Sequence, residues 1–186
     1  MLTEKQGLFL LKLARETIES FVRKKKIKKP SSYDSVFEKK QGVFCTLEEN
    51  GELRGCIGLP YAVKPLIEAV MEAAMSSTQD PRFPPLAENE LKKITIELSV
   101  LTEPEEIKER GRDVLKVIEP HKDGLIMKYG YNSGLFLPQV WDELADKEEF
   151  LTHLCFKAGL PPDYWLRPDI RLYRFHVQAF KEKQEK

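Results

Sequence analysis

The chain of 186 residues is poor in the residue types that usually build metal and redox centres: it has only three cysteines and three histidines. The histidines are scattered along the chain and no Cys-x-x-Cys pair occurs, so the sequence predicts neither a structural zinc site nor an iron–sulfur centre. An odd number of cysteines without framework spacing also argues against a disulfide scaffold. We therefore expect no metal, no cofactor and free thiols, in a cytoplasmic protein.

The chain also lacks an excess of charge and a long apolar run. Its 30 basic and 30 acidic residues give no global field that would attract nucleic acid, so we expect no nucleic-acid partner. No apolar run approaches the roughly 20 residues that cross a bilayer, and the N-terminus lacks the layout of a signal peptide. We therefore expect no membrane association. The one local exception is the basic stretch 23–29, which fits a solvated helix end, with a patch for an anionic partner as the alternative.

What remains is an ordinary globular composition, 41% hydrophobic and 32% charged, of a length that suits one domain spanning residues 1–186. A capping box at Thr3 and Gln6 followed by helical spacing predicts a helix over residues 3–26. Pro65 precedes a second helix, whose apolar stripe ends at Ser77. Two further helices are expected over 138–144 and 147–158.

A β-hairpin is predicted over residues 42–47 and 52–57, because the Asn50-Gly51 pair between them is a strong signal for a two-residue turn. Counting outward from that turn places Cys45 opposite Cys56. Alternation then puts Arg54 on the same face as both thiols. Since both faces of the hairpin are largely apolar, we expect it inside a sheet.

Four other segments complete the predicted sheet. Residues 94–101 form the clearest strand, 124–128 and 134–137 a second hairpin, and 170–180 a last strand. Strands and helices mixed with hairpins indicate an α+β fold.

Several segments carry a resemblance to one family, and their common order makes the match specific. They are Leu53-Arg54-Gly55-Cys56-Ile57-Gly58, Asp80-Pro81-Arg82-Phe83-Pro84-Pro85, Ile96-Glu97-Leu98-Ser99-Val100-Leu101, Asp123-Gly124-Leu125, Leu135-Phe136-Leu137-Pro138-Gln139-Val140 and Lys157-Ala158-Gly159-Leu160. With these segments the chain resembles the AMMECR family, in the archaeal and bacterial type called AmmeMemoRadiSam system protein A.

The resemblance implies a two-lobed α+β domain, in which helices pack on an antiparallel sheet and the motif residues line a cleft. It implies Memo-type and radical-SAM proteins as pathway partners, but no particular reaction, because the family's biochemical function is unsettled. Gly55, Gly58 and Gln139 lie within the motifs and are expected to contribute to a ligand site.

One departure from the family concerns Asp123, where some relatives carry histidine. A mechanism that needs a histidine base at this position would lack it here. His121 lies two residues earlier, on the same side of an extended segment, and is the candidate replacement.

Cys56 is the first candidate for chemistry. A reactive thiol needs a low pKa and partial exposure, and Arg54, two residues away on the strand, would favour the thiolate. The alternative is a small buried hydrophobe, which is the commoner role of a free cysteine.

Asp80 and Arg82 are the second candidates. Arg82 would present a forked donor to a carboxylate or phosphate, with Asp80 as an acid, a base or an orienting group. The alternative is an ion pair that holds down an ordered loop. We expect the loop 80–85 to pack near the hairpin, with Phe83 buried as its anchor and Arg82 turned to the cleft.

Two functions follow from these candidates. In the first, Arg54 and Arg82 bind a small anionic ligand or a partner's peptide without catalysis. In the second, the protein is a small enzyme or enzyme subunit that uses Cys56 as nucleophile or redox thiol and Asp80 as acid or base. No histidine is placed by the sequence to serve Cys56 as a base, which favours binding.

Overall fold

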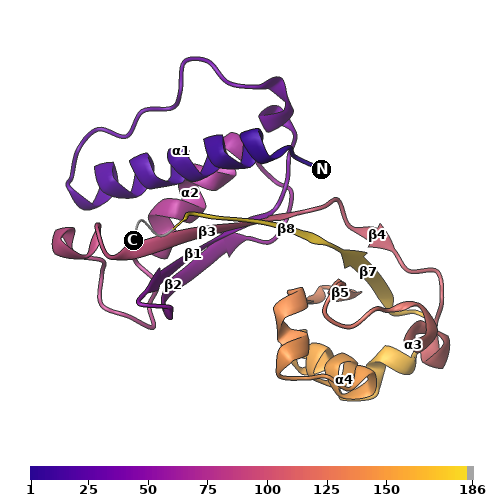
Figure 1. Cartoon of the computed structure of the whole chain (residues 1–186). Coiled ribbons are helices and arrows are strands. Elements are labelled where there is room, and N and C mark those ends of the chain that lie inside the picture. Colours follow the sequence, from indigo (N-terminus) through magenta and orange to yellow (C-terminus); the bar gives the residue numbers. More distant parts are fainter. Residues whose placement is uncertain (184–186) are drawn as a thin grey trace. The chain divides into compact units, whose positions relative to one another are not determined.

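The structure is a computed structural model that describes residues 1–183. The fold is α+β, as predicted, and its strands form two sheets of four strands each (Figure 1). The chain divides into two compact units, each with its own core. Unit 1 contains Met1–Leu101 and the C-terminal segment that begins at Gln178, and unit 2 contains Thr102–Val177. Two units agree with the expected two lobes, while the assignment of one domain to the whole chain stays a prediction.

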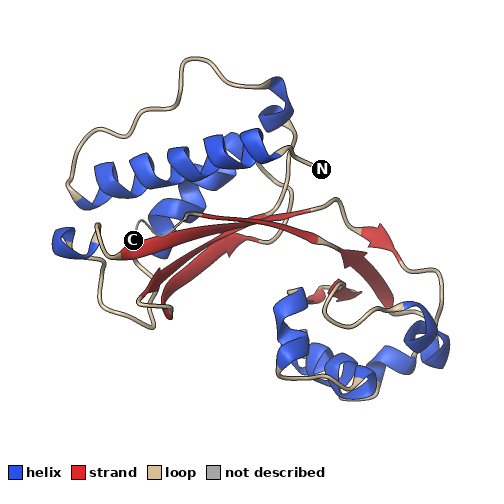
Figure 2. Cartoon of the chain, viewed as in Figure 1, coloured by secondary structure: helices blue, strands red, loops and turns tan. Residues whose placement is uncertain are grey.

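Unit 1 is a sheet with two helices on one face (Figures 1 and 2). The strand order is β2-β1-β3-β8, and β1 is antiparallel to both of its neighbours. The elements are α1 Glu4–Val22, β1 Val43–Glu49, β2 Glu52–Leu59, α2 Leu66–Ser77, β3 Ile94–Leu101 and β8 Val177–Lys181, with short 3₁₀ helices at Ser35–Glu38 and Glu88–Glu90.

The core of unit 1 lies between the helices and the sheet. Along β3 every residue except Glu97 is buried, which explains why 94–101 was the clearest strand in the sequence. Small residues at the buried positions of α2, such as Ala69 and Ala73, let this helix lie close to the sheet beneath it.

Helix α1 begins as predicted and ends earlier than predicted. Thr3 and Gln6 form the reciprocal capping box. The expected extension to residue 26 is wrong, because Arg23 caps the helix and Lys24 takes the left-handed conformation with φ of 54°. The basic stretch therefore begins in the cap of α1 and continues into the following loop.

The hairpin turn is as predicted, but the register beyond it is not. Glu49 faces Glu52 across the turn, and a β-bulge between Leu47 and Glu48 then leaves Arg54 as an extra residue on β2. As a result, Cys56 lies opposite Thr46, and the predicted pairing of Cys45 with Cys56 is wrong.

The bulge also changes which residues share a face of the sheet. Cys45 lies on the buried, helix-covered face of β1, whereas Cys56 shares the other face with Thr46. The expectation that both thiols lie on one face is therefore wrong, and side chains on opposite faces cannot form a disulfide. Strand β2 is also an edge strand rather than an interior one, so only β1 fulfils the expected interior position.

Unit 2 is a second sheet with its helices packed against it. Its strand order is β4-β7-β5-β6. The elements are β4 Glu105–Glu106, α3 Val114–Val117, β5 Gly124–Tyr129, β6 Asn132–Phe136, α4 Lys147–Lys157 and β7 Arg171–Phe175, with 3₁₀ helices at Gly111–Asp113, Pro138–Asp142 and Tyr164–Leu166. In the core, the ring of Trp141 stacks on Phe150 with 3.6 Å between centroids.

Two elements predicted for the C-terminal half of the chain differ in the structure. The single strand expected over 170–180 is two strands, β7 and β8, that belong to different sheets and are separated at His176. The helix expected over 138–144 is a 3₁₀ helix, Pro138–Asp142. The two-residue strand β4 and the one-turn helix α3 are too short for periodicity to reveal.

Candidate functional site

The candidate site lies in unit 1, where the loop after α2 covers the free edge of β2. The backbone N–H of Cys56 donates to the Asp80 carboxylate at 2.9 Å, and Nη2 of Arg82 donates to the Cys56 carbonyl oxygen at 3.4 Å. An exposed edge strand would present these groups unpaired. The side chains of Asp80 and Arg82 therefore provide the hydrogen-bond partners of these backbone groups. The predicted packing of loop 80–85 near the hairpin is confirmed.

Asp80 and Arg82 form a closely coupled ion pair. Oδ1 of Asp80 accepts the backbone N–H and Nε of Arg82, both at 3.0 Å, and Oδ2 accepts Nη2 at 2.6 Å. The Asp80 side chain is 1% exposed and that of Arg82 is 56% exposed. The hydrogen bonds from Arg82, with those of two backbone N–H groups, hold the pKa of Asp80 well below its usual range. Asp80 is thus a buried carboxylate that orients an arginine facing outward.

Arg54 has a partner that the sequence did not reveal. Its Nε and Nη2 donate to the two carboxylate oxygens of Glu90 at 2.7 and 3.1 Å, and Nη2 also donates to the Pro84 carbonyl oxygen at 3.0 Å. The bond from Arg54 lowers the pKa of Glu90, and the backbone N–H of Ala87 adds to this effect. Arg54 therefore ties β2 to both ends of the segment 84–90.

Phe83 brings the two arginines together. The guanidinium carbons of Arg54 and Arg82 lie 5.9 and 5.7 Å from the centroid of its ring, within the range of cation–π contacts. The ring is only partly buried, so the expectation that Phe83 is the buried anchor of the loop is wrong. Leu86, which is 6% exposed, takes that role in the core of unit 1. Both guanidinium groups thus contact the same ring, while the expected cleft that Arg54 and Arg82 would line stays a prediction.

The two cysteines of unit 1 occupy different environments. Cys56 is partly buried, and its Sγ accepts a hydrogen bond from the Thr46 hydroxyl at 3.3 Å. Cys45 is fully buried beside the Ser77 hydroxyl, and burial raises the pKa of its thiol to about 12. Only Cys56 is placed to meet a reagent or ligand.

Gly55 and Gly58 have packing roles in the hairpin. A Cβ on Gly55 would lie 2.4 Å from the Ser77 carbonyl oxygen, and one on Gly58 would lie 2.4 Å from the Val43 carbonyl oxygen. Both glycines thus allow a close approach of backbones that any side chain would prevent. Their contribution to ligand binding stays a prediction.

The remaining predicted residues belong to unit 2. Gln139 is exposed in the Pro138–Asp142 helix, and its place in the ligand site stays a prediction. Asp123 is buried and its Oδ1 lies 2.9 Å from Nε2 of His176, a pairing that the sequence did not reveal. His121 is exposed beside Asp142 with a φ of 62°, so it does not lie on an extended segment and does not replace a histidine at 123.

The described residues hold neither a metal-binding cluster nor a helix that could span a membrane. Among residues 1–183, no group of three or more His, Cys, Asp or Glu side chains is arranged to hold a metal ion. In the same range, no helix has the length and apolar character needed to cross a bilayer.

Comparison with known proteins identifies the family. The model of the AMMECR1 family matches residues 11–180. Protein MJ0810 of Methanocaldococcus jannaschii is 49% identical over 187 residues, which cover 98% of this chain and 92% of the relative. Protein Mbar_A1807 of Methanosarcina barkeri is 48% identical over 190 residues, covering 99% and 94% of the two chains. The crystal structure of the uncharacterized protein PH0010 from Pyrococcus horikoshii matches with a TM-score of 0.87 and 42% identity, covering 98% of this chain and 94% of that one. The chain belongs to the AMMECR1 family.

Proposed function

We propose that the protein is a binding module that holds a small anionic ligand at Arg82, with Arg54 and Phe83 beside it. The observation that carries the proposal is the way Arg82 is held. Asp80 fixes its Nε and Nη2 from the buried side, while more than half of the side chain is exposed. Among residues 1–183, its Nη1 has no hydrogen-bond partner and is available to a ligand. A guanidinium held in this way presents the N–H groups of Nη1, in a fixed orientation, to a carboxylate or phosphate.

The charge balance of the site limits the affinity that we expect for an anionic ligand. Asp80 and Glu90 each neutralise one arginine, so the four groups carry no net charge. A ligand must therefore gain its affinity from directed hydrogen bonds and from the ring of Phe83 more than from a positive field. Binding is expected to be modest and to weaken with salt.

The edge of β2 favours a small ligand over an extended peptide. Strand addition requires free N–H and C=O groups on the edge strand. At Cys56 both groups are already bonded to Asp80 and Arg82.

The alternative function, a thiol enzyme, rests on the position of Cys56. Its thiol is partly buried, and its backbone carbonyl oxygen accepts a hydrogen bond from the Arg82 guanidinium, so a cation lies beside this residue. A nucleophilic thiol also needs a base within hydrogen-bond reach. In the described part of the chain, the thiol's hydrogen-bond partner is the hydroxyl of Thr46, which is no base at neutral pH. We therefore place binding first and catalysis second.

Two variants separate these functions. Binding of inorganic pyrophosphate and of citrate would be measured by calorimetry on the intact protein. Arg82→Lys keeps the charge and loses the Nη1 donors that Asp80 holds in place, so affinity should fall about tenfold to hundredfold. Cys56→Ser should bind within about twofold of the original protein. The proposal of a binding module is wrong if Arg82→Lys leaves the affinity unchanged. It is also wrong if Cys56→Ser alone abolishes complementation of a deletion strain while the protein still folds.

Memo-type and radical-SAM proteins remain the proposed pathway partners, on the strength of the family resemblance. Co-purification with tagged versions of both, from cells that express all three proteins, tests this part of the proposal.

A further inference from the structure

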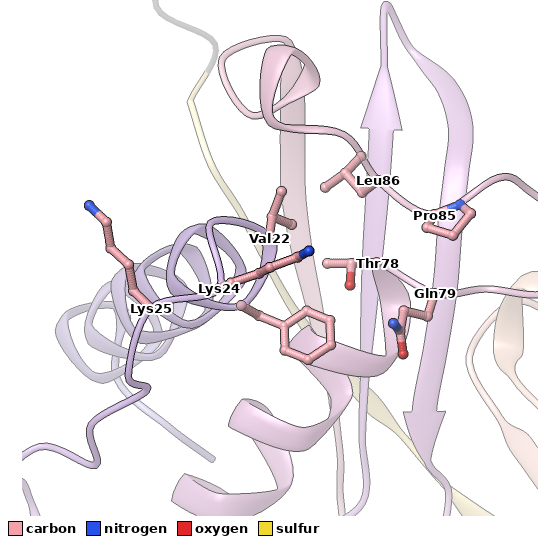
Figure 3. Close-up of a pocket in the computed structure, with 8 residues that line it drawn as sticks. Val22, Lys24, Lys25, Thr78, Gln79, Pro85 and Leu86 are labelled. Atoms are coloured by element: carbon pink, nitrogen blue, oxygen red, sulfur yellow. The ribbon is translucent and has the colours of Figure 1, made fainter.

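A pocket lies in unit 1 at the point where the C-terminal ends of α1 and α2 meet the end of the loop 80–86 (Figure 3). Its volume is about 450 Å³, which is within the roughly 300–1,000 Å³ of small-molecule sites. We call it the α1–α2 pocket. It is lined by Phe21, Val22, Lys24, Lys25, Thr78, Gln79, Pro85 and Leu86. None of these residues belongs to the Arg82 site.

The lining is apolar on one part and cationic on another. Phe21, Val22, Pro85 and Leu86 supply carbon surface. Figure 3 shows the Lys24 side chain directed toward Thr78, whereas Lys25 points away from the other labelled residues. The pocket thus offers an apolar wall with one ammonium group directed into it.

Lys24 occupies a position where glycine is the usual residue. It is the residue after the C-cap of α1, in the left-handed conformation, and the N–H groups of Lys24 and Lys25 bond back to the carbonyl oxygens of Phe21 and Ser20 at 3.0 and 2.8 Å. This is the Schellman arrangement, in which glycine avoids the steric strain that a side chain causes. A strained residue at the rim of a pocket is the kind of outlier that points to a function.

The charges around the pocket are not balanced by the protein itself. In the described part of the chain, neither Lys24 nor Lys25 makes an ion pair, whereas Arg23 is paired with Glu19 and Glu88. The ends of two helices contribute partial negative charge, but their last carbonyl groups already accept hydrogen bonds from the caps. The full charges of the lysines therefore dominate the rim.

We propose that the α1–α2 pocket binds a small organic anion with an apolar body. Its carboxylate, phosphate or sulfonate group would contact the Lys24 ammonium, and its apolar body would pack on Phe21, Val22 and Leu86. This site has no residue in common with the anion site at Arg82. Both sites use the loop after α2, which is closed by a hydrogen bond from the N–H of Leu86 to the Thr78 carbonyl oxygen at 2.9 Å.

A matched pair of dyes tests the proposal on the intact protein. The first is 8-anilinonaphthalene-1-sulfonate, and the second is N-phenyl-1-naphthylamine, which has the same rings without the anionic group. Fluorescence titration should show that the sulfonate binds at least about tenfold more tightly, as expected for a hydrogen bond to a charged group. Phenyl phosphate should displace it. Equal binding of the neutral dye would overturn the proposal.

The variant Lys24→Gly separates a role in binding from a role in folding. Glycine suits the left-handed position, so the melting temperature should stay the same or rise, while sulfonate affinity falls at least about tenfold. Lys26→Gly, at an exposed lysine outside the pocket, is the control and should bind normally. Amide shifts of Thr78, Gln79 and Leu86 on titration would locate the site. Unchanged binding by Lys24→Gly, or shifts confined to other parts of the chain, would refute it.

Discussion

Replacing Asp80 by asparagine should destabilise the protein far more than the change of one atom suggests. The carboxylate accepts four hydrogen bonds of 2.6 to 3.0 Å, two on each oxygen. An amide has only one oxygen, so its NH₂ group must face two donors, whichever way it is turned. Leaving a covered donor unsatisfied costs about 1–3 kcal/mol, and breaking a buried ion pair costs about 3–5 kcal/mol.

Because Arg82 is half exposed and water can partly compensate for the lost bonds, we expect the lower end of that range. The loss in unfolding free energy should be about 3 kcal/mol, which corresponds to roughly 6–12 °C in the melting temperature of a protein of this size. Far-UV circular dichroism during thermal and urea unfolding measures both values. Both tryptophans, Trp141 and Trp165, lie in unit 2, so their fluorescence does not report directly on unit 1.

Asp169→Asn is the matched control. Asp169 also pairs with an arginine two residues away, Arg167, at 2.9 and 3.1 Å, but both side chains are about half exposed. Exposed pairs contribute at most about 1 kcal/mol, so this variant should unfold almost like the original protein. If Asp80→Asn loses no more than Asp169→Asn, the argument for an edge held by Asp80 is refuted.

The loss of unfolding free energy in Asp80→Asn should depend on pH in a defined way. The folded-state pKa of Asp80 is depressed below the value of about 3.9 in an unfolded chain, so its stabilising effect is complete above about pH 5 and is lost as the pH falls toward the folded-state pKa. The difference in unfolding free energy between the original protein and Asp80→Asn should be constant from about pH 7 to 5 and should shrink below about pH 4. A difference that already shrinks at pH 6 would mean that another group is responsible.

Three further predictions concern the hairpin and unit 2. Gly55→Ala should cost about 1–3 kcal/mol in chemical unfolding, because its Cβ would meet the Ser77 carbonyl oxygen; an unchanged midpoint would show that the end of α2 can move. Iodoacetamide should modify Cys56 before Cys45, whose thiol is buried with a pKa of about 12, and peptide mass spectrometry shows the order. Asp123→Asn weakens the contact with His176 and should lower the unfolding free energy of unit 2 by about 1–3 kcal/mol. Tryptophan fluorescence measures this loss, and an equal loss in His176→Gln would support the pairing.

The elements of this fold that depend on local signals could be predicted from the sequence. The capping box of α1, the Asn50-Gly51 turn and the buried strand β3 are each set by residues within a few positions of one another. The predictions are wrong where contacts with a distant part of the chain determine the local structure. The bulge at Arg54 is an example, since the arginine bonds to Glu90, which lies 36 residues later. Gly55 was the one local sign of it, because an isolated glycine in a strand often marks a bulge or a close approach.

The loop after α2 shows the same limit. Three prolines indicate a stiff loop, and its approach to the hairpin was predicted correctly. Composition alone cannot tell which of Phe83 and Leu86 is buried, because both are large and apolar. The structure places the centroid of the Phe83 ring within 5.9 Å of two guanidinium groups, and the contact with Arg54 exists only in the tertiary fold.

The structural roles of the motif residues narrow the search for function. Gly55 and Gly58 allow two close backbone contacts, Arg54 ties the bulge to Glu90, and Asp80 satisfies the edge of β2. Folding alone would therefore require each of these residues. The fold uses Nε and Nη2 of Arg82 to hold Asp80, but it accounts for neither the exposed Nη1 of Arg82 nor the partly buried Cys56 thiol. Comparing Arg82→Lys with Cys56→Ser therefore probes these two groups, provided that the unfolding free energy of each variant is measured beside its function. A loss of function larger than the loss of stability explains identifies the role of the site.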